Sequence, residues 1–200
     1  MILASKSQYR VKLLTDAGLN FEACNAEVDE RAIEEALRGD VSPEAKILPE
    51  DLAQILAEIK ATTVSEQFPD ALVLGCDQIL ALGDEVLHKA IDFEAARANL
   101  LRLSGKTHTL HSAIALAERG EIVWSITVPA FMAMRKLDPA FIGRHLAFAG
   151  DAVLGSVGCY QIEGPGIQLF EKIEGDYWTI IGLPLLPLMA ELRSRGAIDG

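Results

Sequence analysis

Residues 1–18 read MILASKSQYRVKLLTDAG and predict the beginning of an α/β fold. Residues 1–4 form an apolar run that predicts a short strand, and Ser5 and Ser7 predict a turn after it. Apolar residues then recur at positions 11, 13, 14 and 17 and stop at Gly18, a spacing typical of a helix with a glycine after its last turn. This order places the serines at a helix N-terminus.

The rest of the chain alternates between extended and helical patterns, without repeats or low-complexity tracts. We expect extended segments at 21–28, at 71–74 with Asp77 delivered by the strand end, in a hairpin at 79–87 turning at Gly83 and Asp84, and in an antiparallel pair at 106–117 and 121–134. We expect helices at 33–37, 49–65, 92–103, 138–148 and 185–193, a loop at 39–49, and short strands among the glycines of 150–175. The predicted fold class is mixed α/β.

Composition narrows the functions that are compatible with the chain. Its 200 residues, half of them hydrophobic, suit a single domain over 1–200, built as one compact body or as two closely packed lobes. The formal net charge of −11 repels phosphate backbones and argues against binding of long nucleic acid. A few clustered basic residues still suffice to hold a nucleotide.

Cysteine usage and the apolar runs indicate a reduced, non-membrane environment. Cys24, Cys76 and Cys159 are odd in number and far apart, which argues against a disulfide framework or a structural zinc site and predicts reduced core residues. The first residues lack the basic and apolar regions of a signal peptide, and the uncharged run 177–190 is too short to span a bilayer. We expect a soluble cytoplasmic protein that does not bind membranes.

The segment SKSQYR, residues 5–10, is a candidate anion site. A helix N-terminus offers free backbone N–H groups, and the hydroxyl of Ser7 with the guanidinium of Arg10 would complete a phosphate cradle. In the structural alternative, Ser7 is only a helix cap while Lys6 and Arg10 are solvated. This stretch alone favours that alternative, because it lacks the specificity of a Walker loop.

Three acidic residues and two lysines form the next candidates. Asp29, Glu30 and Asp77 are carboxylates that could hold a divalent ion or accept a proton from water, although Asp29 and Glu30 would also suit a helix start. Lys60 shares a helical face with apolar residues, so either its ammonium points at an anion or it is a surface lysine with a partly buried stem. Lys89 has no signal of its own.

Two further patterns are weaker evidence for a functional site. His108 and His111 are three residues apart in an expected strand, so they point to opposite faces and we assign neither to a metal. The glycines of residues 158–166 could let backbone approach a ligand, but loop-building is the commoner reason for such a stretch.

Eight segments in order and spacing resemble the Maf family of nucleoside triphosphate pyrophosphatases, over nearly the whole chain. They are ILASKSQYR, EVDE, the helix that carries Lys60, GCDQ, Lys89, SGKTH, GCYQIEGPG and EGDYWTIIGLPL. The resemblance implies an elongated mixed sheet in two lobes, related to the inosine-triphosphate pyrophosphatase fold, with the nucleotide in a central cleft. It also implies hydrolysis of a nucleoside triphosphate to monophosphate and pyrophosphate with a divalent cation, Mg²⁺ or Mn²⁺.

The resemblance also implies roles for individual residues. Ser7, Arg10 and Lys89 match triphosphate contacts, Glu30 and Lys60 match residues near the metal and phosphates, and Asp77 matches the proton acceptor and a second metal ligand. A possible homodimer is implied by the family alone.

Substrate choice rests on three further positions. One branch of the family, similar to dTTP/UTP pyrophosphatases, carries Arg, Thr and Gln there, whereas the branch similar to 7-methyl-GTP pyrophosphatases carries an aromatic residue, Gln and Glu. Here they are Tyr9, Gln78 and Glu163, so the second branch fits. An aromatic face attracts the cationic 7-methylguanine ring, and a carboxylate accepts hydrogen bonds from the guanine edge. Departures from the family pattern are Gln8 for Pro, Tyr9 for Trp, and His88-Lys89-Ala90 for Gly-Lys-Pro.

The predicted role is therefore removal of a non-standard nucleotide, most consistent with 7-methyl-GTP, before it enters nucleic acid. The alternatives are a pyrimidine-directed pyrophosphatase acting on dTTP, UTP or CTP, and a nucleotide-binding regulator of cell division or septum formation. A phosphatase with a nucleophilic Asp77 is disfavoured, because Ile79 stands where its general acid would be.

Overall fold

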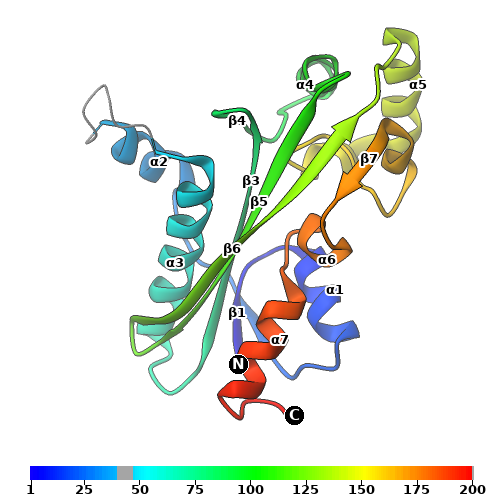
Figure 1. The fold of residues 1–200 in the computed structure, drawn as a ribbon. Coiled ribbons are helices and arrows are strands. Elements are labelled where there is room, and N and C mark those ends of the chain that lie inside the picture. Colours follow the sequence, from blue (N-terminus) through cyan, green and yellow to red (C-terminus); the bar gives the residue numbers. More distant parts are fainter. Residues whose placement is uncertain (40–46, 200) are drawn as a thin grey trace. The chain divides into compact units, whose positions relative to one another are not determined.

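The computed structural model describes residues 1–39 and 47–199 (Figure 1). In chain order the elements are β1 (Ile2–Ala4), α1 (Gln8–Asp16), β2 (Glu22–Cys24), α2 (Glu30–Gly39), α3 (Pro49–Gln67), β3 (Val73–Leu82), β4 (Glu85–Leu87), α4 (Phe93–Leu103), β5 (Thr107–Glu118), β6 (Glu121–Met134), α5 (Pro139–Ala149), the short 3₁₀ helices η1 (Gly150–Gly155) and η2 (Pro165–Leu169), β7 (Phe170–Glu174), α6 (Tyr177–Ile180) and α7 (Leu185–Ser194). The described strands form a seven-stranded mixed sheet, which confirms the predicted α/β class. Most of the loop expected at 39–49 lies outside the described residues.

The chain divides into two compact units, and neither is continuous in sequence. The first consists of residues 1–78, 112–128 and 176–200, and the second of residues 79–111 and 129–175. Strands β3, β5 and β6 contribute residues to both units. The central cleft expected from the family resemblance remains a prediction.

In the first unit, β1 lies between two parallel neighbours. Ile2, Leu3 and Ala4 pair with 22–24 of β2 on one side and with 73–75 of β3 on the other. The order then continues through β5 to β6, which are joined by Arg119 and Gly120. Since a two-residue connection joins only antiparallel neighbours, the predicted antiparallel pair is confirmed.

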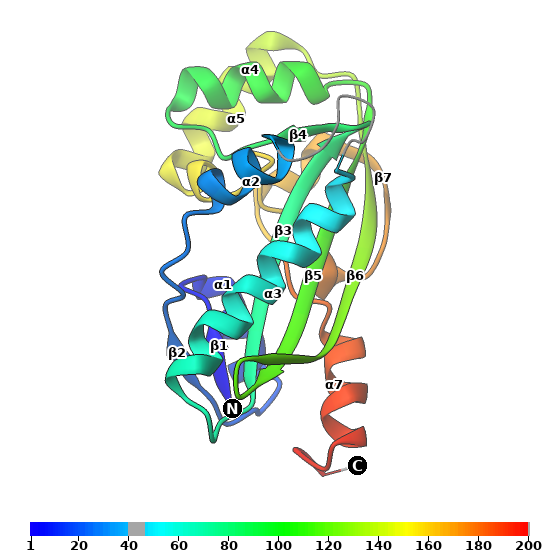
Figure 2. The same ribbon diagram turned by 90° about the vertical axis from the view of Figure 1, so that its left-hand side faces the viewer.

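Alternation along the strands assigns each side chain to a face of the first unit. Leu3, Leu74 and Cys76 share a buried cluster with leucines of α1 and α7, whereas Ile2 and Val73 pack with Val64 of α3. Figures 1 and 2 show α3 on one side of these strands and α1 and α7 on the other. By the same alternation, Asp77 faces α3 and Gln78 faces the side of α1 and α7.

Gly75 of β3 allows α3 to approach the sheet closely. A Cβ added there would lie 2.1 Å from the Ala57 carbonyl oxygen and 2.7 Å from the Ala61 nitrogen. The side chains that α3 presents here are small, since Ala53, Ala57 and Ala61 are all fully buried. The glycine therefore fixes the distance between β3 and the helix that carries Lys60.

In the second unit, β4 forms a hairpin with β3, as expected, and β7 pairs antiparallel with β6. Helix α4 packs against α5 and η1. Asp92 and Asp138 cap the two helices through their carboxylates, which accept hydrogen bonds from Ala95 N and from Ala140 and Phe141 N respectively.

A buried polar pair, His108 and Tyr160, lies in the core of the second unit. Nε2 of His108 is 2.7 Å from the Tyr160 hydroxyl, and the Tyr160 ring meets Phe170 edge-on at 4.8 Å between centroids. Burial raises the pKa of Tyr160 and lowers the pKa of His108 to about 4. Both side chains are therefore neutral near pH 7.

We expect acidification to destabilise the protein through His108. In the unfolded chain this histidine protonates near its usual pKa of 6.5, but in the folded protein only near 4, so protons bind preferentially to the unfolded state between these values. The free energy of unfolding should fall by about 3 kcal/mol from pH 6.5 to 4 because of this residue. Urea unfolding of the wild type and of His108→Gln across this range measures the difference, and parallel pH profiles would contradict the assignment.

Several expected elements differ in the structure. The strand expected to end after 71–74 continues as β3 to Leu82, so Asp77 lies within a strand and not at its end. The segment expected at 21–28 is extended only over Glu22–Cys24, and the helix expected at 33–37 spans Glu30–Gly39. Residues 150–175 contain two 3₁₀ helices and one strand, because turns with local hydrogen bonds replace the expected short strands.

The three cysteines are free thiols, as predicted, but only two of them belong to the core. Cys76 and Cys159 are buried, while Cys24 on β2 is partly exposed. Burial raises the pKa of the Cys76 thiol to about 11, so this thiol stays protonated. Among the helices described, none is long and apolar enough to cross a membrane.

Candidate active site

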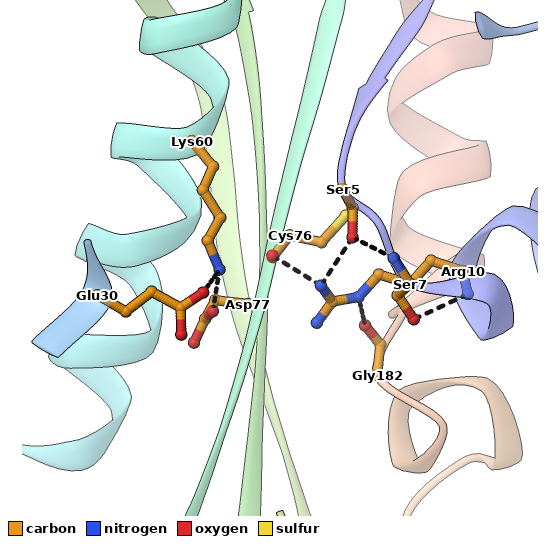
Figure 3. A network of polar contacts seen from close by, with 8 residues as sticks. All are labelled: Ser5, Ser7, Arg10, Glu30, Lys60, Cys76, Asp77 and Gly182. Carbon is orange, nitrogen blue, oxygen red and sulfur yellow. Dashed lines mark hydrogen bonds and ion pairs between the residues drawn. The ribbon is translucent and has the colours of Figure 1, made fainter. Parts of the chain in front are cut away.

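Glu30, Lys60 and Asp77 meet in the first unit. Nζ of Lys60 lies 2.5 Å from Oδ1 of Asp77 and 2.6 Å from Oε1 of Glu30 (Figure 3). Lys60 comes from the sheet-facing side of α3, Asp77 from β3, and Glu30 from the first turn of α2. Asp29 begins that helix, since its Oδ1 accepts a hydrogen bond from Ala32 N. Lys60 therefore points at anions and is not a surface lysine.

The Asp77 carboxylate is buried and lies in an unusual electrostatic environment. Its residue is 5% exposed, and burial raises its pKa above the ordinary range, while the positive charges of Lys60 and Arg10 act in the opposite direction. A carboxylate with a raised pKa that is held by a lysine is a stronger base than a solvated one. Within residues 1–39 and 47–199, Lys60 is the only hydrogen-bond partner found for this carboxylate, and it uses Oδ1.

The turn between β1 and α1 provides the second part of the site. Ser7 N donates to Ser5 Oγ at 3.2 Å, and Ser7 Oγ accepts a hydrogen bond from Arg10 N at 3.4 Å. Ser7 is thus the N-cap of α1, as the structural alternative predicted, and its role as a triphosphate contact remains a prediction. Lys6 is exposed. Backbone N–H groups at a helix N-terminus such as this one are suited to binding an anion.

Arg10 is held by main-chain carbonyls rather than solvated. Its Nε donates to Gly182 O at 2.9 Å, and its Nη1 donates to Cys76 O at 2.9 Å and to Ser5 Oγ at 3.3 Å. The pairing of β1 with β3 ends at Ala4 and Gly75, so the next carbonyl of β3, at Cys76, is available to this arginine. Arg10 is thereby bonded to the residue that precedes Asp77 (Figure 3).

The predicted base-specificity residues divide between the units. Gln78 lies in the first unit, where its Nε2 donates to Ser112 Oγ and to two carbonyls of α6. Tyr9, in the first turn of α1, is 39% exposed. Glu163, like Lys89, is an exposed residue of the second unit. The meeting of Glu163 and Lys89 with the first-unit residues remains a prediction.

Three residues of this network had no role in the sequence prediction: Ser112 of β5, Thr179 of α6 and Gly182 after it. Thr179 and Gly182 act through main-chain carbonyls, and a pattern of side chains in the sequence does not predict such contacts. One signal was available in Asp176, since aspartate is among the residues preferred as the N-cap of a helix. Asp176 Oδ1 does accept a hydrogen bond from Thr179 N at 2.9 Å.

The donor set fits a hard divalent cation. Glu30 and Asp77 are oxygen ligands, and each has a second carboxylate oxygen besides the one that contacts Lys60. The described residues contain no group of three or more His, Cys, Asp or Glu that could hold a metal ion. A Mg²⁺ or Mn²⁺ ion here would therefore need further oxygens, and a nucleotide's phosphates and water are the usual source.

A helix N-terminus, a fixed arginine and a buried carboxylate beside a lysine together indicate an enzyme that acts on a phosphorylated substrate. A model of the Maf-like protein family matches residues 1–195, and the chain belongs to this family.

Individual relatives are similar over their whole length. A 7-methyl-GTP pyrophosphatase of Mesorhizobium japonicum is 60% identical to this chain, covering 100% of it and 98% of the relative. Proteins of the same name from Brucella suis and Rhizobium johnstonii are 57% and 52% identical, with the same coverage. Among solved structures, the Staphylococcus aureus Ham1 protein matches 66% of this chain and 69% of its own at 13% identity and a TM-score of 0.40, a likeness too slight to carry an argument.

Proposed function

We propose that the protein hydrolyses 7-methyl-GTP to 7-methyl-GMP and pyrophosphate and so keeps a non-standard nucleotide out of nucleic acid. The observation that carries this proposal is the contact of Lys60 with Glu30 and Asp77, in a chain 60% identical to a 7-methyl-GTP pyrophosphatase. Full-length similarity to several relatives of that name supports the choice of substrate.

In the proposed reaction, a water oxygen attacks the α-phosphorus while the bond to the oxygen between the α- and β-phosphorus atoms breaks. The Asp77 carboxylate orients the water and accepts its proton, and pyrophosphate leaves with the bond's electron pair. Lys60 holds Asp77 in place through Oδ1, which leaves Oδ2 for the water.

The phosphates would be bound at the N-terminus of α1, where Ser7 and Arg10 supply a hydroxyl and a positive charge. Lys89 is proposed as a triphosphate contact on the family resemblance alone. Arg10 is pre-oriented by two carbonyls, so little side-chain entropy is lost when an anion binds. Glu30 and Asp77 would hold Mg²⁺ or Mn²⁺ together with phosphate oxygens. When bound, such an ion neutralises charge on the phosphates and on the leaving pyrophosphate.

Pyrophosphate release by the purified protein tests the proposal. With Mg²⁺ present, the substrates to compare are 7-methyl-GTP, GTP, dTTP, UTP and CTP. We expect the highest kcat/KM with 7-methyl-GTP. Preference for a pyrimidine nucleotide would replace the proposed substrate and keep the reaction, whereas tight nucleotide binding without pyrophosphate release would support a regulatory protein instead.

Variants of Tyr9 and Glu163 test the two proposed base contacts one at a time. Tyr9→Ala removes the aromatic face for the cationic ring, and Glu163→Gln removes the carboxylate that would accept from the guanine edge. We expect each change to reduce the preference for 7-methyl-GTP over UTP by about tenfold. Glu171→Gln makes the same chemical change at an exposed position of the second unit and should leave the preference intact. Unchanged preference in both variants would show that neither Tyr9 nor Glu163 contacts the base.

A further inference from the structure

The orientation of the Gln78 carboxamide is fixed by a chain of hydrogen bonds with one allowed direction. Ser112 Oγ lies 2.7 Å from Thr179 O, and because a carbonyl has no hydrogen to give, the hydroxyl must donate this bond. The Ser112 oxygen can then only accept from Gln78, 2.8 Å away. Gln78 must therefore direct its NH₂ group, and not its carbonyl, at Ser112.

Two further carbonyls enforce the same orientation. Nε2 of Gln78 also donates to Thr179 O at 3.2 Å and to Ile180 O at 3.0 Å. A flipped amide would place Oε1 against three oxygens, two of which cannot donate. The hydrogens of Nε2 are thus used within the protein, and Oε1 is the group of Gln78 that is left to contact a ligand.

The segment 176–182 is itself held rigidly and serves both Gln78 and Arg10. Asp176 caps α6 by accepting from Thr179 N at 2.9 Å and also from the Thr179 hydroxyl. A Cβ added to Gly182 would lie 3.6 Å from Gln78 Oε1 and 3.6 Å from Arg10 Nη2, so both groups border the space beside this glycine. The carbonyls of this segment therefore orient two side chains that face the same space.

We infer that Ser112 is a positioning residue for substrate recognition: with the carbonyls of Thr179 and Ile180, it fixes Gln78 so that Oε1 meets a hydrogen-bond donor of the substrate. This inference rests on the proposed function for the identity of that donor, an N–H of the nucleotide base. Ser112 is fully buried and acts only through Gln78. It makes this position selective for a donor and unfavourable for an acceptor.

A double-mutant cycle between Ser112 and Gln78 tests the inference, with 7-methyl-GTP as substrate. We expect Ser112→Ala to raise KM about tenfold with kcat within about twofold of wild type, because only the positioning of a binding group is lost. In a Gln78→Ala background, Ser112→Ala should have no further effect on kcat/KM. Ser112→Thr retains the hydroxyl and should restore most of the affinity.

Ser125→Ala is a matched control in the same unit. Ser125 is also a strand serine between a glutamine and an acceptor, since its Oγ accepts from Gln54 Nε2 and donates to Glu58 Oε1. This variant should keep wild-type KM. Effects of Ser112→Ala that persist undiminished in the Gln78→Ala background, or an unchanged KM in a folded Ser112→Ala protein, would overturn the inference.

Two further measurements test the inference if Ser112→Ala fails to fold or if 7-methyl-GTP is not the substrate. Gln78→Glu keeps the side-chain shape and Oε1 but removes the donors, and should lower kcat/KM about as much as Gln78→Ala.

In the ¹⁵N-labelled full chain, Ser112→Ala or Ser112→Thr can be compared with wild type by solvent exchange of the Gln78 side-chain amide. Exchange should be slow in wild type and Ser112→Thr, and equal exchange in wild type and a folded Ser112→Ala would refute the inference whatever the substrate. A wild type that fails to hydrolyse 7-methyl-GTP, with the exchange pattern as expected, would refute the proposed function alone and support the role of Ser112.

Discussion

Replacement of Asp77 by Asn is expected to lower kcat by about a thousandfold or more, with the fold preserved. Asparagine has the same shape, but its amide cannot accept a proton from water at neutral pH. Lys60 keeps its contact with Glu30, so the buried ammonium is still paired in the variant. Pyrophosphate release under saturating substrate measures the effect, and circular dichroism and thermal unfolding report on the fold.

The matched control for this experiment is Asp70→Asn. Asp70 is an exposed aspartate shortly before β3, so the change removes one negative charge from the same unit without touching Lys60. We expect this variant to keep wild-type kcat. Substantial turnover by a folded Asp77→Asn protein would mean that another group accepts the proton.

Gly75→Ala is expected to lower the free energy of unfolding by about 3 kcal/mol and to reduce activity as well. The new methyl group would lie 2.1 Å from the Ala57 carbonyl oxygen, which belongs to helix backbone and cannot rotate away as a side chain could. Helix α3 must therefore move as a body, and Lys60 moves with it. Urea unfolding and pyrophosphate release on the same preparation measure both effects.

Gly143→Ala provides the comparison for that variant. Gly143 lies inside α5, and a Cβ there would have no atom within 4 Å apart from the nearby backbone of its own helix. Alanine favours the helix, so the free energy of unfolding should stay level or rise by up to about 1 kcal/mol. An unfolding free energy of Gly75→Ala as high as that of Gly143→Ala would contradict this prediction. It would mean that the close packing of α3 on β3 does not exclude a methyl group at Gly75.

Local signals in the sequence predicted much of the fold. Ser7, Asp92 and Asp138 were expected at helix starts, and each accepts a backbone hydrogen bond there. Pro49 was expected in the first turn of α3, and it is the first residue of that helix. Such signals succeed because a cap or a proline acts within one turn of its own position.

Signals that depend on distant partners misled the prediction. Gly75 looked like the end of an apolar strand, but its missing side chain serves the approach of α3 and the strand continues past it. For Lys60 a surface lysine was the commoner interpretation, because its partners Glu30 and Asp77 come from other parts of the chain and give no local signal. The carbonyls that hold Arg10 and Gln78 could not be foreseen, since every residue has one and only the fold decides which are close.

The carbonyl of Gly182 that holds Arg10 also has a consequence for biosynthesis. The two residues are 172 positions apart, and Thr179 follows Gln78 by 101. Since ribosomes make proteins from the N-terminus, Arg10 and Gln78 emerge long before the residues that orient them. A nascent chain that stalls before residue 176 contains Lys60 and Asp77 but lacks the carbonyls that orient Arg10 and Gln78, so we expect the proposed activity only after translation has passed residue 182.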